Sequence, residues 1–169
     1  MSTYLMLFTL VHVLISLVAI AGGFVVMYEL LRSQASRGWT AFFLATTVLT
    51  SVTGFGFPVV HVTPGHVLGV LSLIALGLAL YALYSRQLVG RWRTVYVVTA
   101  LVAQYFNVFV LIVQSFQKVP ALHALAPTQT EWPFALVQGL ALVGFVAAGY
   151  LSTARFPTAG VATSGRLPA

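Results

Sequence analysis

Residues 4–31 read YLMLFTLVHVLISLVAIAGGFVVMYELL, a stretch without Lys or Arg in which Glu29 is the single acidic residue. A helix needs about 20 mostly apolar residues to cross the hydrocarbon core of a bilayer. This stretch is longer than that, and it lacks the alternation of apolar and polar residues that is typical of a membrane β-strand. We therefore predict that it forms a membrane-spanning helix.

Four further apolar runs follow, at residues 39–58, 64–84, 94–117 and 134–152. The whole chain is 60% hydrophobic and only 6% charged, whereas a soluble domain has about 25% charged residues. Inside lipid, only helices and closed barrels satisfy the polar groups of the backbone. The sequence therefore predicts an all-α, polytopic membrane helix bundle with five transmembrane helices within residues 1–153.

The basic residues predict the orientation of this bundle. Of the eight Lys and Arg residues, seven fall on one side of the predicted spans and only Lys118 falls on the other. Because positive residues favour the cytoplasmic side, we expect the N-terminus outside and the C-terminus in the cytoplasm. Residues 154–169 are rich in Pro, Gly, Ser and Thr, which predicts a disordered cytoplasmic tail.

Composition also narrows the classes of function. The formal net charge is +6, but no basic cluster with interleaved exposed aromatics accompanies it, so nucleic acid is not an expected partner. The absence of Cys excludes disulfides and thiolate metal sites. No nucleophile–base arrangement, P-loop or dinucleotide fingerprint is present. An enzymatic activity is therefore not the leading prediction.

Amide side chains recur along the fourth predicted span. They recur at helical spacing and fall within one face about 140° wide at 100° per residue: Gln104, Asn107, Gln114 and Gln117. Gln138 on the fifth span is a natural partner. The functional interpretation is a ligand site or a water-lined path, and the alternative is hydrogen bonding between helices, the usual role of buried amides in membranes.

All four histidines, His12, His61, His66 and His123, fall on the predicted outer half of the protein. Imidazoles ligate haem iron and other metals, so haem b held by His12 and His66 is one hypothesis. The two residues lie about 9 Å apart in depth at 1.5 Å per residue, which disfavours that pair. The alternative is a set of interfacial histidines bound to water, backbone or lipid headgroups.

The second predicted span ends in Gly54-Phe55-Gly56-Phe57-Pro58. Two glycines before a proline loosen a helix, and Phe55 and Phe57 could then wall a pocket near the outer leaflet. Such a mixture of aromatics and amides suits a lipid or a quinone. The alternative is a helix end with aromatic anchors.

Small residues and charges predict further contacts. Small residues should allow close helix packing on the first span, at Ala19 and Gly23, and on the fifth, at Gly139 and the set Ala141, Gly144 and Ala148. Glu29 lies three residues before Arg32, a spacing that allows an ion pair. Residues 119–126 in the longest linker should form a short helix in the interface, serving either as a small lid or as a plain connector.

The chain resembles a group of small bacterial inner-membrane proteins without a known activity. The resemblance covers roughly residues 40–150 and is carried by three motifs: Gly54-Phe55-Gly56-Phe57-Pro58 with His61 and Pro64-Gly65-His66; Tyr105-Phe106-Asn107-Val108-Phe109-Val110; and Leu125-Ala126-Pro127-Thr128-Gln129 with Glu131 and Pro133-Phe134. It implies a multi-pass protein of the bacterial inner membrane. The size and the histidines are also similar to those of small cytochrome b subunits, by analogy only.

Three hypotheses follow. The first is a non-enzymatic membrane module, either a subunit of a larger assembly or homo-oligomer, or a binder of a small lipid-like or quinone-like ligand. The second is a redox subunit that holds haem b or quinone. The third is a small channel or transporter along the amide face of the fourth span.

Overall fold

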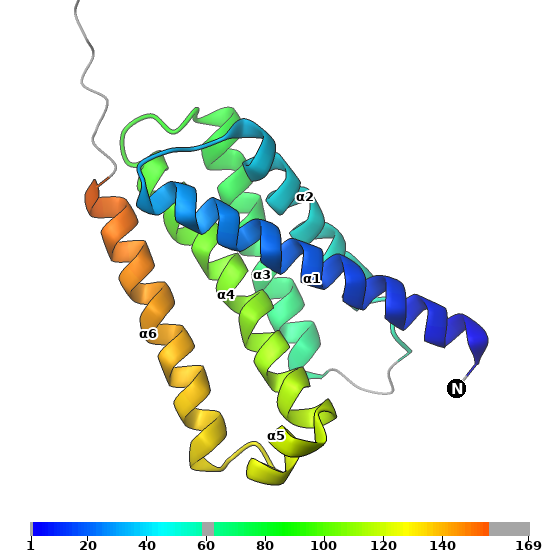
Figure 1. Cartoon of the computed structure of the whole chain (residues 1–169). Coiled ribbons are helices and arrows are strands. Elements are labelled where there is room, and N and C mark those ends of the chain that lie inside the picture. Colours follow the sequence, from blue (N-terminus) through cyan, green and yellow to red (C-terminus); the bar gives the residue numbers. More distant parts are fainter. Residues whose placement is uncertain (1, 59–62, 156–169) are drawn as a thin grey trace, which may run out of the picture.

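A computed structural model describes residues 2–58 and 63–155, and every regular element in this part of the chain is helical (Figure 1). The prediction of an all-helical protein is therefore confirmed, and each predicted span corresponds to one long helix. The predicted disordered tail, from residue 156 onward, lies outside the described residues. The elements are α1 Thr3–Leu31, α2 Arg37–Gly54, α3 Pro64–Leu80, the π-helix η1 Tyr81–Ser85, α4 Trp92–Lys118, α5 Pro120–Leu125 and α6 Trp132–Arg155.

Four helical segments in the described part of the chain are long and apolar enough to cross a membrane: α1, α3 continued by η1, α4 and α6. α2 is the exception. It has 18 residues, five of them Thr and one Ser, so its composition is more polar than that of the other long helices. Its length of about 27 Å would nearly span the hydrocarbon core. Length and composition thus identify four spans, one fewer than the sequence predicts.

The long helices run alternately up and down the bundle, which separates the charges (Figure 1). Six arginines lie at or beside helix termini at one end, which we call the basic end: Arg32, Arg37, Arg86, Arg91, Arg93 and Arg155. Lys118 lies at the opposite end with His66 and His123, and His12 lies in the half of α1 that leads to it. We call this the histidine end.

Side-chain acceptors fix the turn between α1 and α2. The Ser36 backbone N–H donates to Oε2 of Glu29 at 3.1 Å, and the Ser36 hydroxyl oxygen accepts from the Trp39 backbone N–H at 3.3 Å, capping α2. The Glu29 carboxylate is used here, instead of in the ion pair with Arg32 that the spacing predicts. The Arg32 guanidinium lies over the ring of Tyr28, 4.9 Å from its centroid.

The π-helix η1 ends the third span at the basic end. The Arg86 backbone N–H donates to the Tyr81 carbonyl at 3.1 Å, and the Arg86 guanidinium lies 5.3 Å and 5.1 Å from the ring centroids of Tyr81 and Trp92. Leu88 and Gly90 then adopt positive φ angles of 57° and 58°. This left-handed backbone reverses the chain into α4 within a few residues.

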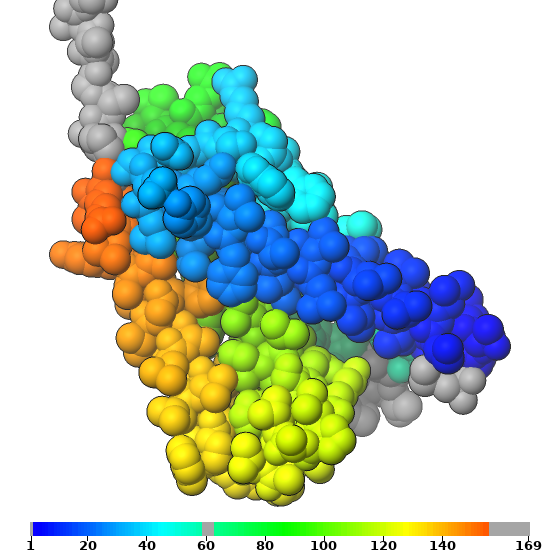
Figure 2. Space-filling view, in the orientation of Figure 1, coloured from blue at the N-terminus to red at the C-terminus, as the bar shows by residue number. Residues whose placement is uncertain are grey.

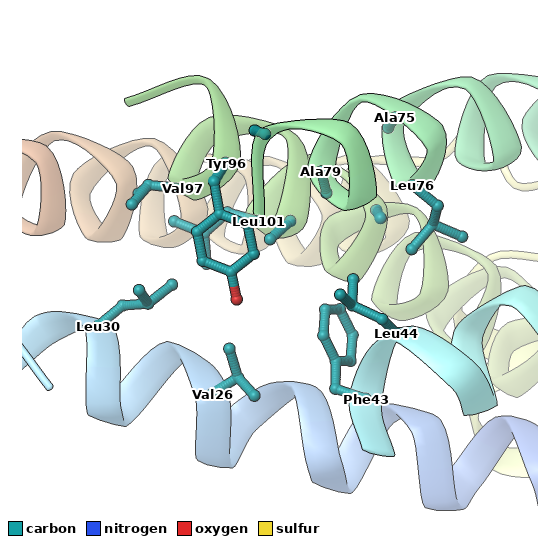
Figure 3. Packing of buried hydrophobic residues seen from close by; sticks show 13 residues of the cluster. Val26, Leu30, Phe43, Leu44, Ala75, Leu76, Ala79, Tyr96, Val97 and Leu101 are labelled. Carbon is teal, nitrogen blue, oxygen red and sulfur yellow. The ribbon is translucent and has the colours of Figure 1, made fainter. Parts of the chain in front are cut away.

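α4 is the central helix of the bundle, and the core gathers around its first half. Tyr96, Val97 and Leu101 point from α4 toward side chains of three neighbouring helices (Figure 3). The partners are Val26 and Leu30 of α1, Phe43 and Leu44 of α2, and Ala75, Leu76 and Ala79 of α3. The Tyr96 hydroxyl donates to Thr40 at 3.4 Å. The tightest packing therefore lies in the half of the bundle nearer the basic end.

The opposite half is more open. The N-terminal end of α1 projects past the other described helices (Figure 2), and the first buried residue of this helix is Ala19. α6 is also peripheral, with Gln138, Ala148 and Ser152 as its buried residues. The outer faces of both helices are apolar and would be covered by lipid.

Gln104 on α4 joins the bundle to α1 near the middle of both helices. Its amide Nε2–H donates to the Ile20 carbonyl at 2.8 Å, and its side chain is 1% exposed. A Cβ atom at Gly23 would overlap the Gln104 amide, so only glycine leaves room for it. The predicted packing at Ala19 and Gly23 is confirmed, and so is that at Ala148, which is buried on α6. Nothing lies within 4 Å of a Cβ at Gly139 or Gly144, so the prediction is wrong for these two glycines.

We expect Gly23→Ala to destabilise the protein by about 1–3 kcal/mol, because an overpacked core must shift side chains or backbone. Gly77→Ala is the matched control, since nothing lies within 4 Å of a Cβ there, and it should cause no loss. Unfolding by sodium dodecyl sulphate in mixed micelles, followed by circular dichroism, measures both. Adding Gln104→Ala should reduce the loss of stability that Gly23→Ala causes. Equal losses of stability in Gly23→Ala and Gly77→Ala would contradict the close contact between Gly23 and Gln104.

Candidate functional site

A histidine and three neighbours meet where the N-terminal half of α1 crosses the end of α2. Nδ1 of His12 lies 2.8 Å from Oγ1 of Thr53. The His12 ring packs edge-on against Phe57 at 5.1 Å between centroids, and Phe57 packs the same way against Phe8 at 5.0 Å. We call His12, Thr53, Phe57 and Phe8 the His12 cluster.

Local sequence explains why these residues meet. Phe8 and His12 are four residues apart on α1, so their side chains share one face. α2 ends at Gly54, and the following residues leave the helix axis and approach α1. A Cβ at Gly56 would come within 2.7 Å of Cζ of Phe8, so the absence of a side chain at Gly56 makes room for the Phe8 ring.

We assign the tautomer of His12 from the hydrogen bonds of Thr53. The Thr53 hydroxyl lies 2.8 Å from the Leu49 carbonyl, the usual bond of a helical threonine to its own backbone, and we assign its single proton to that bond. On this assignment its oxygen accepts from His12, which places the proton of a neutral ring on Nδ1 and a lone pair on Nε2. Among residues 2–58 and 63–155, Thr53 is the hydrogen-bond partner of this half-buried ring, so the lone pair of Nε2 is available to a ligand.

His66 lies on the other side of the same segment and has the opposite pattern. The Thr63 backbone N–H donates to Nδ1 of His66 at 3.3 Å, so Nδ1 carries the lone pair and Nε2 the proton of the neutral ring. The ring lies 5.6 Å from that of Phe55. Phe55 in turn covers Gly69, where a Cβ would lie 3.1 Å from its ring.

The segment from Thr53 to Phe57 thus separates the two histidines, with Phe57 toward α1 and Phe55 toward α3. Ligation of haem iron through Nε2 requires a lone pair there and a donor at Nδ1. His12 meets this requirement, whereas His66 uses Nδ1 as an acceptor at the start of α3. The arrangement fits a pair of haem ligands poorly. In the described part of the chain, no group of three or more His, Asp or Glu residues could hold a metal ion.

The other two predicted histidines do not join the cluster. His123 lies in the last turn of α5 and is exposed. His61 lies outside the described residues.

The amides of α4 and α6 link helices rather than line one pocket. Nδ2 of Asn107 donates to Thr47 of α2 at 3.4 Å, and Nε2 of Gln138 donates to the Phe109 carbonyl at 3.2 Å. With the bond from Gln104 to α1, α4 is joined to three other helices, α1, α2 and α6. Gln114 is half-buried and has no hydrogen bond to the described residues. These bonds match the alternative interpretation of this face, in which amides join neighbouring helices.

The linker after α4 closes the histidine end with fixed contacts. Its predicted short helix is confirmed as α5. Nε2 of Gln129 donates to the Val113 carbonyl at 3.1 Å, which ties the linker to α4. The Glu131 carboxylate accepts from the backbone N–H groups of Thr128 and Thr130, each at 3.1 Å, and from the Thr128 hydroxyl at 2.9 Å. This set of bonds folds the turn that precedes α6.

These hydrogen bonds also affect the protonation of Glu131. Desolvation acts to raise the pKa of the carboxyl, but the bonds from Thr128 and Thr130 outweigh it and hold the pKa below its ordinary value of 4.5. Because the folded-state pKa is lowered, the carboxylate stabilises the turn above the ordinary pKa. That contribution is lost as the pH falls through the lowered pKa.

A separate apolar groove lies between α2 and the end of the third span, away from the predicted site residues. Its volume is about 600 Å³. The groove is lined by Ala41, Leu44, Ala45, Val48, Leu49, Val52, Leu80 and Tyr84.

Comparison with known proteins adds no assignment. No family model matches the chain, and neither a curated protein nor a solved structure matches it. The site therefore has to be interpreted from its own geometry.

Two members of the His12 cluster were absent from the residues that the sequence marks as candidates. Phe8 could have been found from its spacing to His12 on one helical face. Thr53 gives no such signal, because most hydroxyls in membrane helices bond to their own backbone. Only the crossing of α1 over α2 shows that Thr53 also accepts from His12.

We expect ¹⁵N NMR of the His12 ring to show a protonated Nδ1 and an unprotonated Nε2 at neutral pH. Thr53→Val removes the acceptor and should shift the population toward the tautomer protonated at Nε2, which is the commoner form of a free imidazole. Thr50→Val is the matched control on the same helix and should leave the His12 signals unchanged. A predominantly Nε2-protonated ring in the native protein would contradict this assignment.

We expect the amide protons of Thr128 and Thr130 to shift together as the pH is lowered, with a midpoint below 4.5, because their acceptor loses its charge. Solution NMR in detergent measures these shifts. Glu131→Gln should abolish the titration while His123→Ala leaves it in place. A midpoint above the ordinary value would show that the carboxylate does not accept these bonds.

Proposed function

We propose that this protein is a small, non-enzymatic membrane module that binds a lipid-like or quinone-like ligand at the His12 cluster. The observation that carries the proposal is the available lone pair on Nε2 of His12, beside the rings of Phe8 and Phe57. A polar acceptor next to aromatic rings, in a half-buried position on a membrane helix, suits an amphipathic ligand.

The proposed topology has five spans, with α2 as the fifth crossing helix. α2 packs between α1 and α3. Its Thr46 and Thr53 hydroxyls donate to carbonyls of the preceding turn, which satisfies them within lipid, whereas Oγ1 of Thr50 has no hydrogen-bond partner among the described residues. The six arginines of the basic end favour the cytoplasm. The N-terminus and the His12 cluster would then lie on the outer side of a bacterial inner membrane.

The tautomer of His12 narrows the chemistry of the ligand. A lone pair on Nε2 accepts a hydrogen bond and cannot donate one while the ring is neutral. The ligand head should therefore carry a hydroxyl or another donor. A benzoquinol has such a hydroxyl, whereas the corresponding benzoquinone offers only carbonyl acceptors.

The alternative functions receive less support from the same contacts. A haem held by two histidines would need His66 to release its bond to the start of α3. A channel along α4 would need free amides, but Gln104 and Asn107 bond to neighbouring helices. Association with other membrane subunits or with a second copy stays compatible with the exposed apolar faces of α1 and α6.

We expect purified protein to bind a short-tailed benzoquinol more tightly than the matching benzoquinone. His12→Ala should weaken binding of the quinol by roughly five- to tenfold, the effect of losing one hydrogen bond of about 1 kcal/mol. Anaerobic isothermal titration calorimetry in detergent measures both ligands.

His123→Ala is the matched control, because His123 is exposed on α5 and lies outside the cluster. It should leave the affinity for the quinol unchanged. Equal affinities for quinol and quinone, or an unchanged affinity in His12→Ala, would refute the proposed ligand chemistry.

A further inference from the structure

The apolar groove between α2 and the third span is lined in part by exposed small residues. Leu44 is 2% exposed, whereas Ala41 and Ala45 beside it are exposed although they line the groove. Leu80 and Tyr84 line it from the third span. Two alanines where larger apolar residues would fill the space leave a channel open on the lipid-facing side of α2.

The groove runs along most of α2, from about one turn after its start at the basic end to Val52, two residues before its end. From Ala41 to Val52 it follows twelve residues of helix, a rise of about 16 Å at 1.5 Å per residue. One leaflet contributes about half of the roughly 30 Å hydrocarbon core. The groove therefore has the length of an acyl chain that enters from the headgroup region at the basic end.

A cation lies at the mouth of the groove. Arg37 precedes Ala41 by four residues and so shares its helical face, and helical side chains tilt toward the N-terminus, here toward the headgroup region. Within the described part of the chain the Arg37 guanidinium has no hydrogen bond, ion pair or ring contact. By contrast, Arg32 and Arg86 lie over aromatic rings, and Glu29 is used by Ser36.

We propose that this groove is a binding site for one anionic phospholipid, whose acyl chain lies between α2 and α3 and whose phosphate meets Arg37. The N-terminus of α2 adds positive partial charge at the same place. An acyl chain would cover the exposed methyl groups of Ala41 and Ala45. The headgroup end of this site, at Arg37, lies at the end of the bundle opposite the His12 cluster, while the groove extends to Val52, next to Thr53 of that cluster. The lipid is proposed from separate residues and does not depend on the ligand of the His12 cluster.

Native mass spectrometry of the detergent-purified full-length protein, with added lipid, tests the site. The probes are phosphatidylglycerol and phosphatidylcholine with identical acyl chains. We expect the native protein to retain phosphatidylglycerol about fivefold more than phosphatidylcholine, the effect of one cation near a headgroup. Arg37→Gln should bring that ratio close to one, while Ala41→Leu with Ala45→Leu should reduce retention of both lipids.

The controls keep the charge and volume changes but place them elsewhere. Arg32→Gln removes a cation from the same end, and Ala147→Leu adds volume to an exposed position of α6; neither should change lipid retention. Full lipid retention by the variant with Ala41→Leu and Ala45→Leu would contradict binding in the groove. If Arg32→Gln lost the preference for phosphatidylglycerol as much as Arg37→Gln, diffuse surface charge would explain that preference and the site at Arg37 would be refuted. If circular dichroism shows that the variant with Ala41→Leu and Ala45→Leu does not fold, the lipid retention of Ala45→Leu alone and of Arg37→Gln tests the site instead.

Discussion

The satisfaction of polar groups within the chain itself is the constraint on which the rest of the structure depends. Helices in hydrocarbon have no water to bond with, so internal partners stabilise their hydroxyls and amides. Four buried atoms in the described residues lack such a partner: Oγ1 of Thr50, Oγ of Ser152, and Oε1 of Gln104 and Gln138. Several hydroxyls donate to the carbonyl four residues earlier on their own helix: Thr9, Ser16, Thr46, Thr53, Thr99, Ser115 and Thr153. The longer amides reach neighbouring helices instead, which makes them the polar links that hold the bundle together.

This division between local and long-range bonds also produces the candidate site. A hydroxyl that has donated its proton to its own helix can still accept, and Thr53 accepts from His12. That second bond fixes the tautomer of the imidazole and leaves a lone pair on Nε2 beside two phenylalanine rings. At the other end of the bundle, a groove beside two small residues faces lipid under an arginine. The two ends thus offer different chemistry, an acceptor at one and a cation at the other.

Much of the site was visible in the sequence as residue types, but the partnerships were not. His12, Phe55 and Phe57 stood out as a histidine and aromatics near a helix end, and the structure places His12 against Phe57 and His66 against Phe55. The amide face of α4 looked like one surface, yet Gln104 bonds to α1 and Asn107 to α2, because the two positions lie about 60° apart around the helix and face different neighbours. No pattern in the sequence pointed to Arg37 and the alanines after it as a second site.

The sequence by itself determined the all-helical class, the positions of the long helices and the separation of basic residues from histidines, because run length, composition and alternating helix direction suffice for these. The tertiary structure alone decided which polar atoms meet. Helix tilt and crossing depend on side-chain volume at contacts such as Gly23 with Gln104, where a single methyl group would block the approach. Such contacts join residues far apart in the chain, so no local pattern encodes them.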